Sequence, residues 1–176
     1  AAYEADKDRI PEIDINLKND QTWKNELFKC KIFHIPGHTS GHICIYINEI
    51  NALFTGDTLF SLGCGRIFEG TYDEMYESLN KLKSFPKKTQ IYCGHEYTKK
   101  NSDFCLYFDP KNSKLQEKVL AINKHIQNGT PTIPTLLGDE LECNIFLRSD
   151  NSEIQKQLGI NSKDPFKTFV KLRDLK

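Results

Sequence analysis

Apolar and polar residues alternate along much of the first half of the chain, as they do in strands that are buried on one face. Five segments carry this strand pattern: 13–17, 27–35, 42–47, 52–54 and 89–93. Segment 42–47 is apolar at nearly every position, so we expect a central strand that is covered on both faces. Residues 48–51 are expected to form a short hairpin connection into the next strand.

A helical period interrupts the strands once. Thr71 is a suitable N-cap and Pro86 ends the segment, and four apolar residues between them lie on one helix face: Met75, Tyr76, Leu79 and Leu82. The order strand, strand, strand, helix, strand predicts a sheet with a helical layer outside it. We therefore assign the chain to the α+β class.

Helical periodicity replaces the strand pattern in the second half of the chain. A helix is predicted between an Asn112 cap and the stop at Asn128 and Gly129. Its apolar residues recur at spacings of four, three and four, at Leu115, Val119, Ile122 and Ile126. This spacing is typical of a helix that buries one face.

The end of the chain is expected to be helical as well. Residues 130–134 are typical of an extended connector stiffened by proline, and short helices are expected near 152–158 and 164–175. We predict two parts, a sheet-containing body over 1–95 and a small helical domain over 96–176.

Composition limits the classes of function. A chain of 176 residues can form one substantial core, with room for a small appendage. Lysine plus arginine equals aspartate plus glutamate, 24 against 24, so no overall field attracts nucleic acid or an anionic membrane. The first 20 residues are too polar for a signal peptide. We expect a soluble, cytoplasmic protein in which any charged ligand is held by a local cluster of charge.

The six cysteines include no Cys-x-x-Cys pair, and reduced thiols in a cytosol-like compartment are the favoured interpretation. Cys64 and Cys93 lie close in sequence to the turns described next. A ligand or redox role is open for either, and buried packing is the simpler alternative.

Three turns place a potential metal ligand directly after a strand and a glycine. The residues are His38, Asp57 and His95, preceded by Gly37, Gly56 and Gly94. Imidazole and carboxylate together suit zinc, iron or manganese, and a carboxylate has two oxygens with which to bridge a metal pair. The trio predicts part of a metal site that is short of ligands.

Simpler interpretations exist for these and the neighbouring residues. Polar residues after glycine are common in ordinary turns. His42 lies four residues after His38 and is either a further ligand or a hydrogen-bonding residue near the start of a strand. His34 and His125 are interpreted as ordinary histidines of a strand and a helix. Glu96 either supports His95 or lies on the surface.

Four sequence blocks together closely resemble one known family. The blocks are Pro-Gly-His-Thr-Ser-Gly-His, Thr-Gly-Asp-Thr, Gly-Cys-Gly-Arg and Cys-Gly-His-Glu-Tyr, in this order along the chain. They resemble glyoxalase II, the hydroxyacylglutathione hydrolase branch of the metallo-β-lactamase superfamily. The resemblance runs from about Arg9 to the last residue. It implies the second half of an αββα sandwich over 1–95 and a glutathione-binding helical domain over 96–176.

The resemblance implies a binuclear site and a reaction. His38 would be a terminal ligand of one metal, His95 a terminal ligand of the other, and Asp57 the catalytic bridge between them. Two divalent ions, zinc first and iron or manganese as alternatives, would hold a hydroxide that attacks the thioester of an S-2-hydroxyacylglutathione. The products would be glutathione and a 2-hydroxy acid such as D-lactate, which is the chemistry of methylglyoxal detoxification.

Four residues match the family's glutathione contacts: Arg66, Tyr97, Arg173 and Lys176. Glutathione carries two carboxylates, which call for local positive charge. Taken without the family, Arg173 and Lys176 would be an ordinary basic helix end. Phe68 stands where some relatives have tyrosine, so a hydroxyl contact expected there is missing.

The family also uses a His-x-His-x-Asp-His motif, which these 176 residues do not contain. We therefore expect that an N-terminal part is missing. We also expect that the chain binds metal weakly, hydrolyses little and exposes an apolar sheet face. The complete protein is expected to be a monomer. Two alternatives remain open. One is another superfamily enzyme, such as a lactonase, a persulfide dioxygenase or a nuclease. The other is a truncated, non-catalytic module that binds glutathione or a partner.

Overall fold

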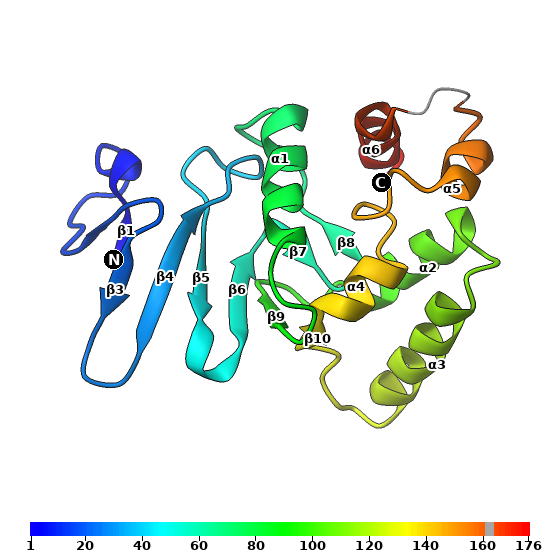
Figure 1. Cartoon of the computed structure of the whole chain (residues 1–176), viewed down its shortest axis with the longest axis horizontal. Coiled ribbons are helices and arrows are strands. Elements are labelled where there is room, and N and C mark those ends of the chain that lie inside the picture. Colours follow the sequence, from blue (N-terminus) through cyan, green and yellow to red (C-terminus); the bar gives the residue numbers. More distant parts are fainter. Residues whose placement is uncertain (161–163) are drawn as a thin grey trace.

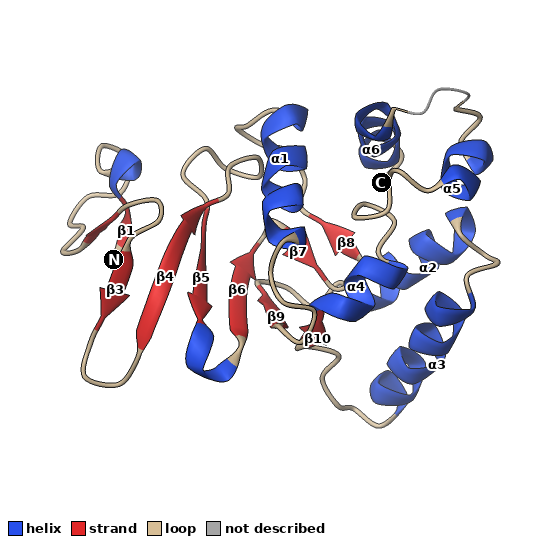
Figure 2. Ribbon diagram, viewed as in Figure 1, coloured by secondary structure: helices blue, strands red, loops and turns tan. Residues whose placement is uncertain are grey.

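The computed structural model describes residues 1–160 and 164–176, and its main element is a mixed sheet flanked by helices (Figures 1 and 2). The strands run in the order β10, β9, β6, β5, β4, β3 across the sheet. Their bounds are Thr135–Leu136, Gln90–Cys93, Ala52–Gly56, Ile43–Ile47, Lys29–His34 and Thr22–Lys24. All neighbours are antiparallel except β6 and β9, which are parallel.

Four of the five predicted strands are confirmed as β4, β5, β6 and β9. Of the predicted strand 13–17, only Asn16–Leu17 form a strand, β2. It pairs in parallel with β1 (Ala2–Tyr3) outside the main sheet. The strands β3 and β10 were not predicted, because each is only two or three residues long. The connection after β5 is a 3-10 turn, Asn48–Ile50. A separate hairpin, β7 (Leu59–Phe60) with β8 (Gly63–Cys64), projects toward the helices.

Within the described residues, six α-helices accompany the sheet: α1 (Tyr72–Lys83), α2 (Thr98–Phe108), α3 (Ser113–Gln127), α4 (Leu137–Cys143), α5 (Ser152–Gln157) and α6 (Pro165–Asp174). Helix α1 begins with the predicted Thr71 cap, which forms a reciprocal capping box with Glu74. Helix α3 follows the predicted Asn112 cap. Its Leu115, Val119 and Ile122 are buried, but Ile126, the fourth residue of the predicted apolar face, is exposed.

Helices α2 and α4 were not predicted. The buried side of α2 includes Thr98, Asn101 and Ser102, so its hydrophobic pattern is weak. Helix α4 likewise buries Glu140. Polar residues on a buried face remove the periodic signal from which a helix is usually recognised.

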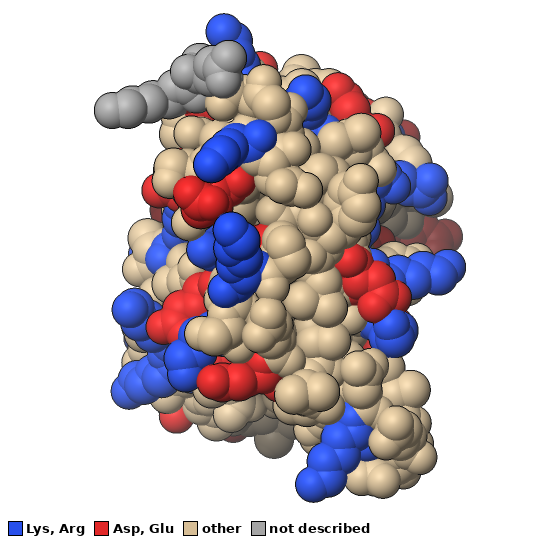
Figure 3. Space-filling view, turned by 90° about the vertical axis from the view of Figure 1, so that its right-hand side faces the viewer, with Lys and Arg blue, Asp and Glu red and all other residues tan. Residues whose placement is uncertain are grey.

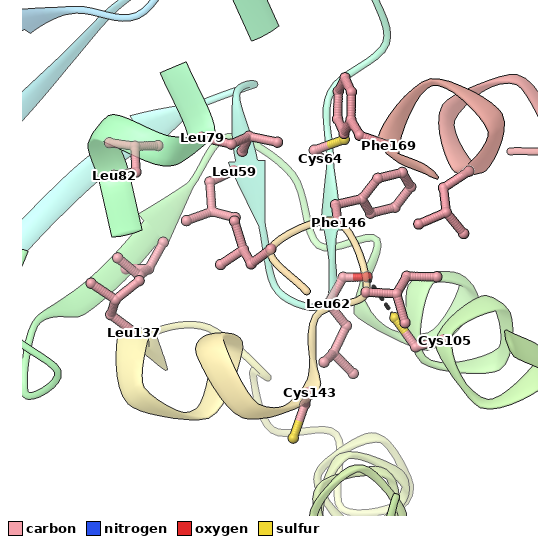
Figure 4. Packing of buried hydrophobic residues seen from close by; sticks show 14 of the residues in the cluster. Leu59, Leu62, Cys64, Leu79, Leu82, Cys105, Leu137, Cys143, Phe146 and Phe169 are labelled. Atoms are coloured by element: carbon pink, nitrogen blue, oxygen red, sulfur yellow. Dashed lines mark hydrogen bonds between the residues drawn. The ribbon is translucent and has the colours of Figure 1, made fainter. Parts of the chain in front are cut away.

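One large apolar core joins the sheet to the helices. It includes residues of α1, the β7–β8 hairpin, α2, α4 and α6, and Figure 4 shows this packing around Leu62, Phe146 and Phe169. The Cys105 thiol donates a hydrogen bond to the Leu62 carbonyl oxygen at 3.2 Å. The core therefore fixes the position of the hairpin against the helical segment.

Most cysteines are packing residues. All six thiols are free, and each is buried except that of Cys93, which is half-buried. Burial raises the pKa of the Cys44 and Cys105 thiols to about 12, so they stay protonated at neutral pH. Of the two cysteines near the site turns, Cys64 is buried, as the packing alternative predicts, and Cys93 is half-buried.

The sheet face opposite α1 is only partly covered, so the expectation that 42–47 is covered on both faces is wrong. Cys44 is buried on the α1 side, whereas Ile43, Ile45 and Ile47 of β5 are half-buried on the other. Phe54 of β6 is 40% exposed and stacks on Tyr92 of β9. The expected exposed apolar face is therefore present.

The helical side of the molecule has a mixed surface. Figure 3 shows acidic and basic side chains interspersed there, with no continuous field of either sign. None of the helices in 1–160 and 164–176 is long and apolar enough to span a bilayer.

Candidate functional site

His38, Asp57 and His95 meet at one end of the sheet. The Asp57 Oδ2 atom lies 3.5 Å from His38 Nε2 and 3.4 Å from His95 Nε2. Asp57 and His95 follow β6 and β9, and because these strands are parallel their carboxyl ends lie at the same edge. His38 arrives from the turn between β4 and β5. The structure therefore places the Asp57 carboxylate between the two imidazoles.

Glycines allow the surrounding loops to approach Asp57 closely. The Gly94 N–H donates to the Gly56 carbonyl oxygen at 2.8 Å. A Cβ atom at Gly94 would lie 2.5 Å from Asp57 Oδ1, and one at Gly65 would lie 1.8 Å from the Asp57 carbonyl oxygen. A side chain at either position would displace Asp57 or its loop, which explains the glycine requirement physically.

The orientation of His38 is fixed by the backbone. Its Nδ1 lies 2.8 Å from the Arg66 carbonyl oxygen. Because a carbonyl oxygen only accepts, Nδ1 carries a hydrogen, and Nε2 is the nitrogen that faces Asp57. This arrangement is typical of a histidine that binds a metal through Nε2.

His42 is not oriented as a further donor of the trio but forms a hydrogen bond with the backbone of the Asp57 turn. Its Nε2 accepts a hydrogen bond from the Asp57 backbone N–H at 3.0 Å, so this nitrogen is already engaged. Burial, followed by the charge of His38, lowers the pKa of His42, which favours the neutral ring that such acceptance requires. The hydrogen-bonding alternative for His42 is confirmed, and it supports the backbone of the Asp57 turn.

The trio fits the role of a partial metal donor set. Asp57 Oδ1 is buried without a hydrogen-bond partner within 1–160 and 164–176, an arrangement that costs free energy unless a cation or water meets the oxygen. Within the same residues, no point is surrounded by three or more His, Cys, Asp or Glu side chains that could hold one ion. The trio therefore offers two imidazoles and one carboxylate to a cation.

A cavity of about 400 Å³ opens at the trio. All seven residues singled out in the sequence line it, namely His38, Asp57, Arg66, His95, Tyr97, Arg173 and Lys176. The sequence did not single out Phe60 and Asn101, which also line it. The cavity therefore collects residues from the β4–β5 turn to the last residue of the chain.

The cationic residues of the cavity are held in different ways. Arg66 is exposed and its guanidinium lies 5.1 Å from the centre of the Phe68 ring. Arg173 is only 8% exposed and donates to the Cys64 carbonyl oxygen at 2.8 Å. Arg173 therefore ties α6 to the end of β8 in addition to lining the cavity.

Lys176 extends the positive charge beyond Arg173. Its Nζ donates a hydrogen bond to Asn101 Oδ1 and lies 4.9 Å from the centre of the Phe104 ring. Burial lowers the pKa of Lys176 to about 8. The partner of the ammonium is a neutral amide, which does not cancel its positive charge, so the charge can attract an anionic ligand.

The β7–β8 hairpin beside the cavity is held by hydrogen bonds with buried polar residues that were not predicted from the sequence. Glu140 of α4 accepts the Leu62 backbone N–H at 2.7 Å, and Asn144 donates to the Gly63 carbonyl oxygen at 3.1 Å. Asn101 of α2 donates to the Ser61 carbonyl oxygen at 2.8 Å. In the sequence these residues look like surface positions, and no local signal distinguishes them.

The remaining histidines and Glu96 lie outside the cavity. His34 Nε2 contacts the Ser40 carbonyl oxygen at 2.7 Å, and His125 Nδ1 contacts the Thr130 hydroxyl at 2.9 Å. Glu96 accepts a hydrogen bond from the Thr132 hydroxyl at 2.7 Å and so anchors the connector 130–134 rather than His95. The alternative in which Glu96 supports His95 is therefore wrong.

The N-terminal segment is pinned to the loops of the site. Arg9 donates to both carboxylate oxygens of Glu69, at 2.8 and 2.5 Å, and to the Ser40 hydroxyl at 3.1 Å. Hydrogen bonds from Arg9 and from the Ser40 N–H lower the pKa of Glu69 to about 2. Because Glu69 follows Phe68, this contact also fixes the loop that covers His38.

Comparison with known proteins identifies the class of the fold and then the family. Residues 4–95 match the model of the metallo-beta-lactamase superfamily, in keeping with the mixed sheet and the histidine–aspartate trio. Residues 96–176 match the model described as "Hydroxyacylglutathione hydrolase C-terminus". The chain belongs to the hydroxyacylglutathione hydrolase family of this superfamily.

Curated relatives agree with the family models. The chain is 55% identical to a hydroxyacylglutathione hydrolase of Pelagibacter ubique over 99% of its own length and 67% of that relative's length. It is 40% identical to one of Rhodospirillum rubrum, over 97% of this chain and 67% of that relative. The chain thus spans about two thirds of the length of these relatives.

Solved structures agree on the fold. ETHE1 from Myxococcus xanthus is 18% identical, with a TM-score of 0.61 over 93% of this chain and 53% of that chain. A metallo-beta-lactamase from Staphylococcus aureus is 20% identical, with a TM-score of 0.56 over 99% of this chain and 45% of that chain. At these identities the likeness concerns the fold alone.

Proposed function

We propose that this chain carries the thioesterase chemistry of glyoxalase II. The substrate is an S-2-hydroxyacylglutathione such as S-lactoylglutathione, and the products are glutathione and a 2-hydroxy acid such as D-lactate. One observation supports this most strongly: a single cavity collects the His38, Asp57 and His95 donors together with four cationic side chains, those of Arg66, Lys100, Arg173 and Lys176. The six free cysteines support action in a reducing compartment such as the cytoplasm.

The trio would hold two divalent ions, for which we propose zinc, with Asp57 shared between His38 and His95. Such ions supply a water activated at neutral pH and offset the negative charge that develops on the thioester carbonyl oxygen. The protein's own part is to orient the donors, through the Arg66 carbonyl oxygen on His38 and the His42 ring on the Asp57 backbone. The leaving thiolate is a stable anion, so no strong general acid is required.

The other side of the cavity suits glutathione. Its two carboxylates require local positive charge, which Arg66, Arg173 and Lys176 provide. Tyr97 stacks on His95 and presents its ring to the cavity. We propose that 1–95 supplies the metal donors and Arg66, whereas 96–176 supplies the other glutathione contacts.

Glutathione binding is expected to weaken at alkaline pH. Because the pKa of Lys176 is about 8, its ammonium is charged below that pH and loses its charge as the pH rises through it. The affinity for S-methylglutathione, measured calorimetrically, should fall roughly three- to tenfold between about pH 7 and pH 9.

The ligand's own amino group titrates over the same range, so a variant is needed as reference. Lys176→Met removes the charge at every pH and should bind more weakly at neutral pH. The ratio of wild-type to variant affinity is expected to shrink as the pH rises. A ratio that stays constant across the range would contradict a role for the Lys176 charge.

Thioester hydrolysis tests the proposed function directly. We would assay S-lactoylglutathione with zinc, following release of the thiol, on two proteins. One is the 176-residue chain, and the other is an extended chain that adds the part of the Pelagibacter relative outside the match. The extended chain should hydrolyse the thioester, and the 176-residue chain should do so weakly. An extended chain that binds zinc but prefers a lactone or glutathione persulfide would contradict the proposal.

A second candidate function is glutathione binding without catalysis. It is favoured by the small donor set, one imidazole and a shared carboxylate for each ion, because zinc normally takes at least three protein ligands. Zinc analysis of the 176-residue chain separates the two candidates. Two ions for each chain, with turnover, would exclude the non-catalytic module.

A further inference from the structure

The end of the cavity that holds the metal donors is walled by aromatic rings. Phe68 lies 4.9 Å from the His38 ring, Tyr97 lies 5.0 Å from the His95 ring, and Phe60 lies 5.4 Å from the Tyr97 ring, all measured between ring centres. All three rings also line the cavity. We call Phe60, Phe68 and Tyr97 the aromatic wall.

Phe68 is the most exposed ring of the aromatic wall, followed by Tyr97 at 49%. Phe68 is 63% exposed, whereas Phe60 on the same wall is buried. Its ring packs against the His38 imidazole and lies 5.1 Å from the Arg66 guanidinium. When a ligand covers a large apolar surface at a cavity, the free energy of the complex falls, so binding is favoured.

The loop that carries Phe68 is held in place. The Phe68 N–H donates to the His38 carbonyl oxygen at 3.2 Å, and the next residue, Glu69, is bound by Arg9. The ring is therefore presented to the cavity by a fixed backbone, so a ligand meets it without a large ordering cost.

The cationic side chains are distributed around the cavity. Arg173 is anchored at Cys64 and Lys176 at Asn101, whereas Arg66 lies beside Phe68. The thioester of a glutathione conjugate has to lie at the donors, so its sulfur substituent lies against the aromatic wall, which flanks both imidazoles. This orientation rests on the proposed function.

We propose that the site selects glutathione conjugates whose sulfur substituent is bulky and apolar, and that Phe68 is the residue that determines this preference. The substrate class is then 2-hydroxyacyl thioesters with aromatic or branched side chains, in preference to the small lactoyl group. A phenyl substituent can stack offset or edge-on against Phe68, with Phe60 and Tyr97 as further apolar surface. A methyl group covers little of this surface.

The test uses conjugates that need no turnover. S-methyl-, S-butyl- and S-benzylglutathione carry the same peptide and an increasing apolar group, and their affinities for the 176-residue chain are measured by calorimetry. We expect S-benzylglutathione to bind about tenfold more tightly than the S-methyl conjugate. Phe68→Ala should reduce this ratio to about twofold or less and leave S-methylglutathione nearly unchanged. Phe68→Leu should retain part of the ratio.

A matched control distinguishes an effect of the aromatic wall from the effect of removing any exposed phenylalanine. Phe28 is an exposed phenylalanine that contacts Trp23 and does not line the cavity, so Phe28→Ala should keep the full ratio. An equal affinity of the wild-type chain for all three conjugates would overturn the aromatic preference alone. An unchanged ratio in Phe68→Ala would overturn the role of Phe68. Failure of all three conjugates to bind would overturn this proposal and the proposed function together.

Discussion

Replacing Asp57 with asparagine is expected to abolish zinc binding at the cavity. It should also lower the rate of thioester hydrolysis by the extended chain at least about 10³-fold. This factor is the upper end of the loss in kcat that follows removal of one oxyanion-hole donor. Asp57 lies between both imidazoles, so the variant weakens both halves of the donor set at once. An amide is neutral and offers only one oxygen to a cation. Zinc content after dialysis and the rate of thiol release measure the two effects.

The stability of the metal-free protein separates this effect from misfolding. Asp57 Oδ1 is buried without a hydrogen-bond partner in the described residues. Removing the charge should therefore leave the metal-free chain as stable as wild type or more stable, by up to about 1 kcal/mol. Asp103→Asn is a suitable control, because Asp103 is an exposed α2 residue paired with Lys99. Equal zinc affinity in Asp57→Asn and wild type would contradict the assignment of Asp57.

Replacing Glu140 with alanine is expected to cause the largest loss of stability, about 3–5 kcal/mol in the free energy of unfolding, as when one partner of a buried ion pair is removed. Glu140 is 0% exposed. It accepts hydrogen bonds from the Leu62 N–H and the Thr135 hydroxyl, both at 2.7 Å, and pairs with Lys118 at 3.3 Å. Alanine would leave these donors buried and unsatisfied.

Urea unfolding with linear extrapolation measures this loss. Glu142→Ala is the matched control, because Glu142 is an exposed residue of the same helix, and it should change stability by no more than about 0.5 kcal/mol. Glu140→Gln should cost less than the alanine variant, because it keeps an acceptor oxygen. A loss below about 1 kcal/mol in Glu140→Ala would contradict the importance of this network.

Local pattern was sufficient for most of the regular structure. The strands β4, β5, β6 and β9 have alternating or continuous apolar runs, and α1 has both a capping box and an apolar face. Such signals lie within a few residues of one another, so they can be recognised without the fold. The covering of β5 could not be predicted in this way, because it depends on what packs against the sheet.

The buried polar residues of α2 and α4 explain the main failures. Asn101, Glu140 and Asn144 bond to backbone atoms of the β7–β8 hairpin that are 40, 78 and 81 residues away in sequence. A polar residue is compatible with burial only where such partners are present. Nothing near these residues in the sequence indicates that the partners exist.

The sequence by itself determined which residues could form the site. His38, Asp57 and His95 each follow a strand and a glycine, and these features are local. The tertiary structure decided the arrangement: the Asp57 carboxylate lies between both imidazoles, His42 bonds to the Asp57 backbone, and Phe68 stands open on the cavity. The physical reason is that donor geometry and burial depend on distances between segments far apart in the chain, which only the packed core fixes.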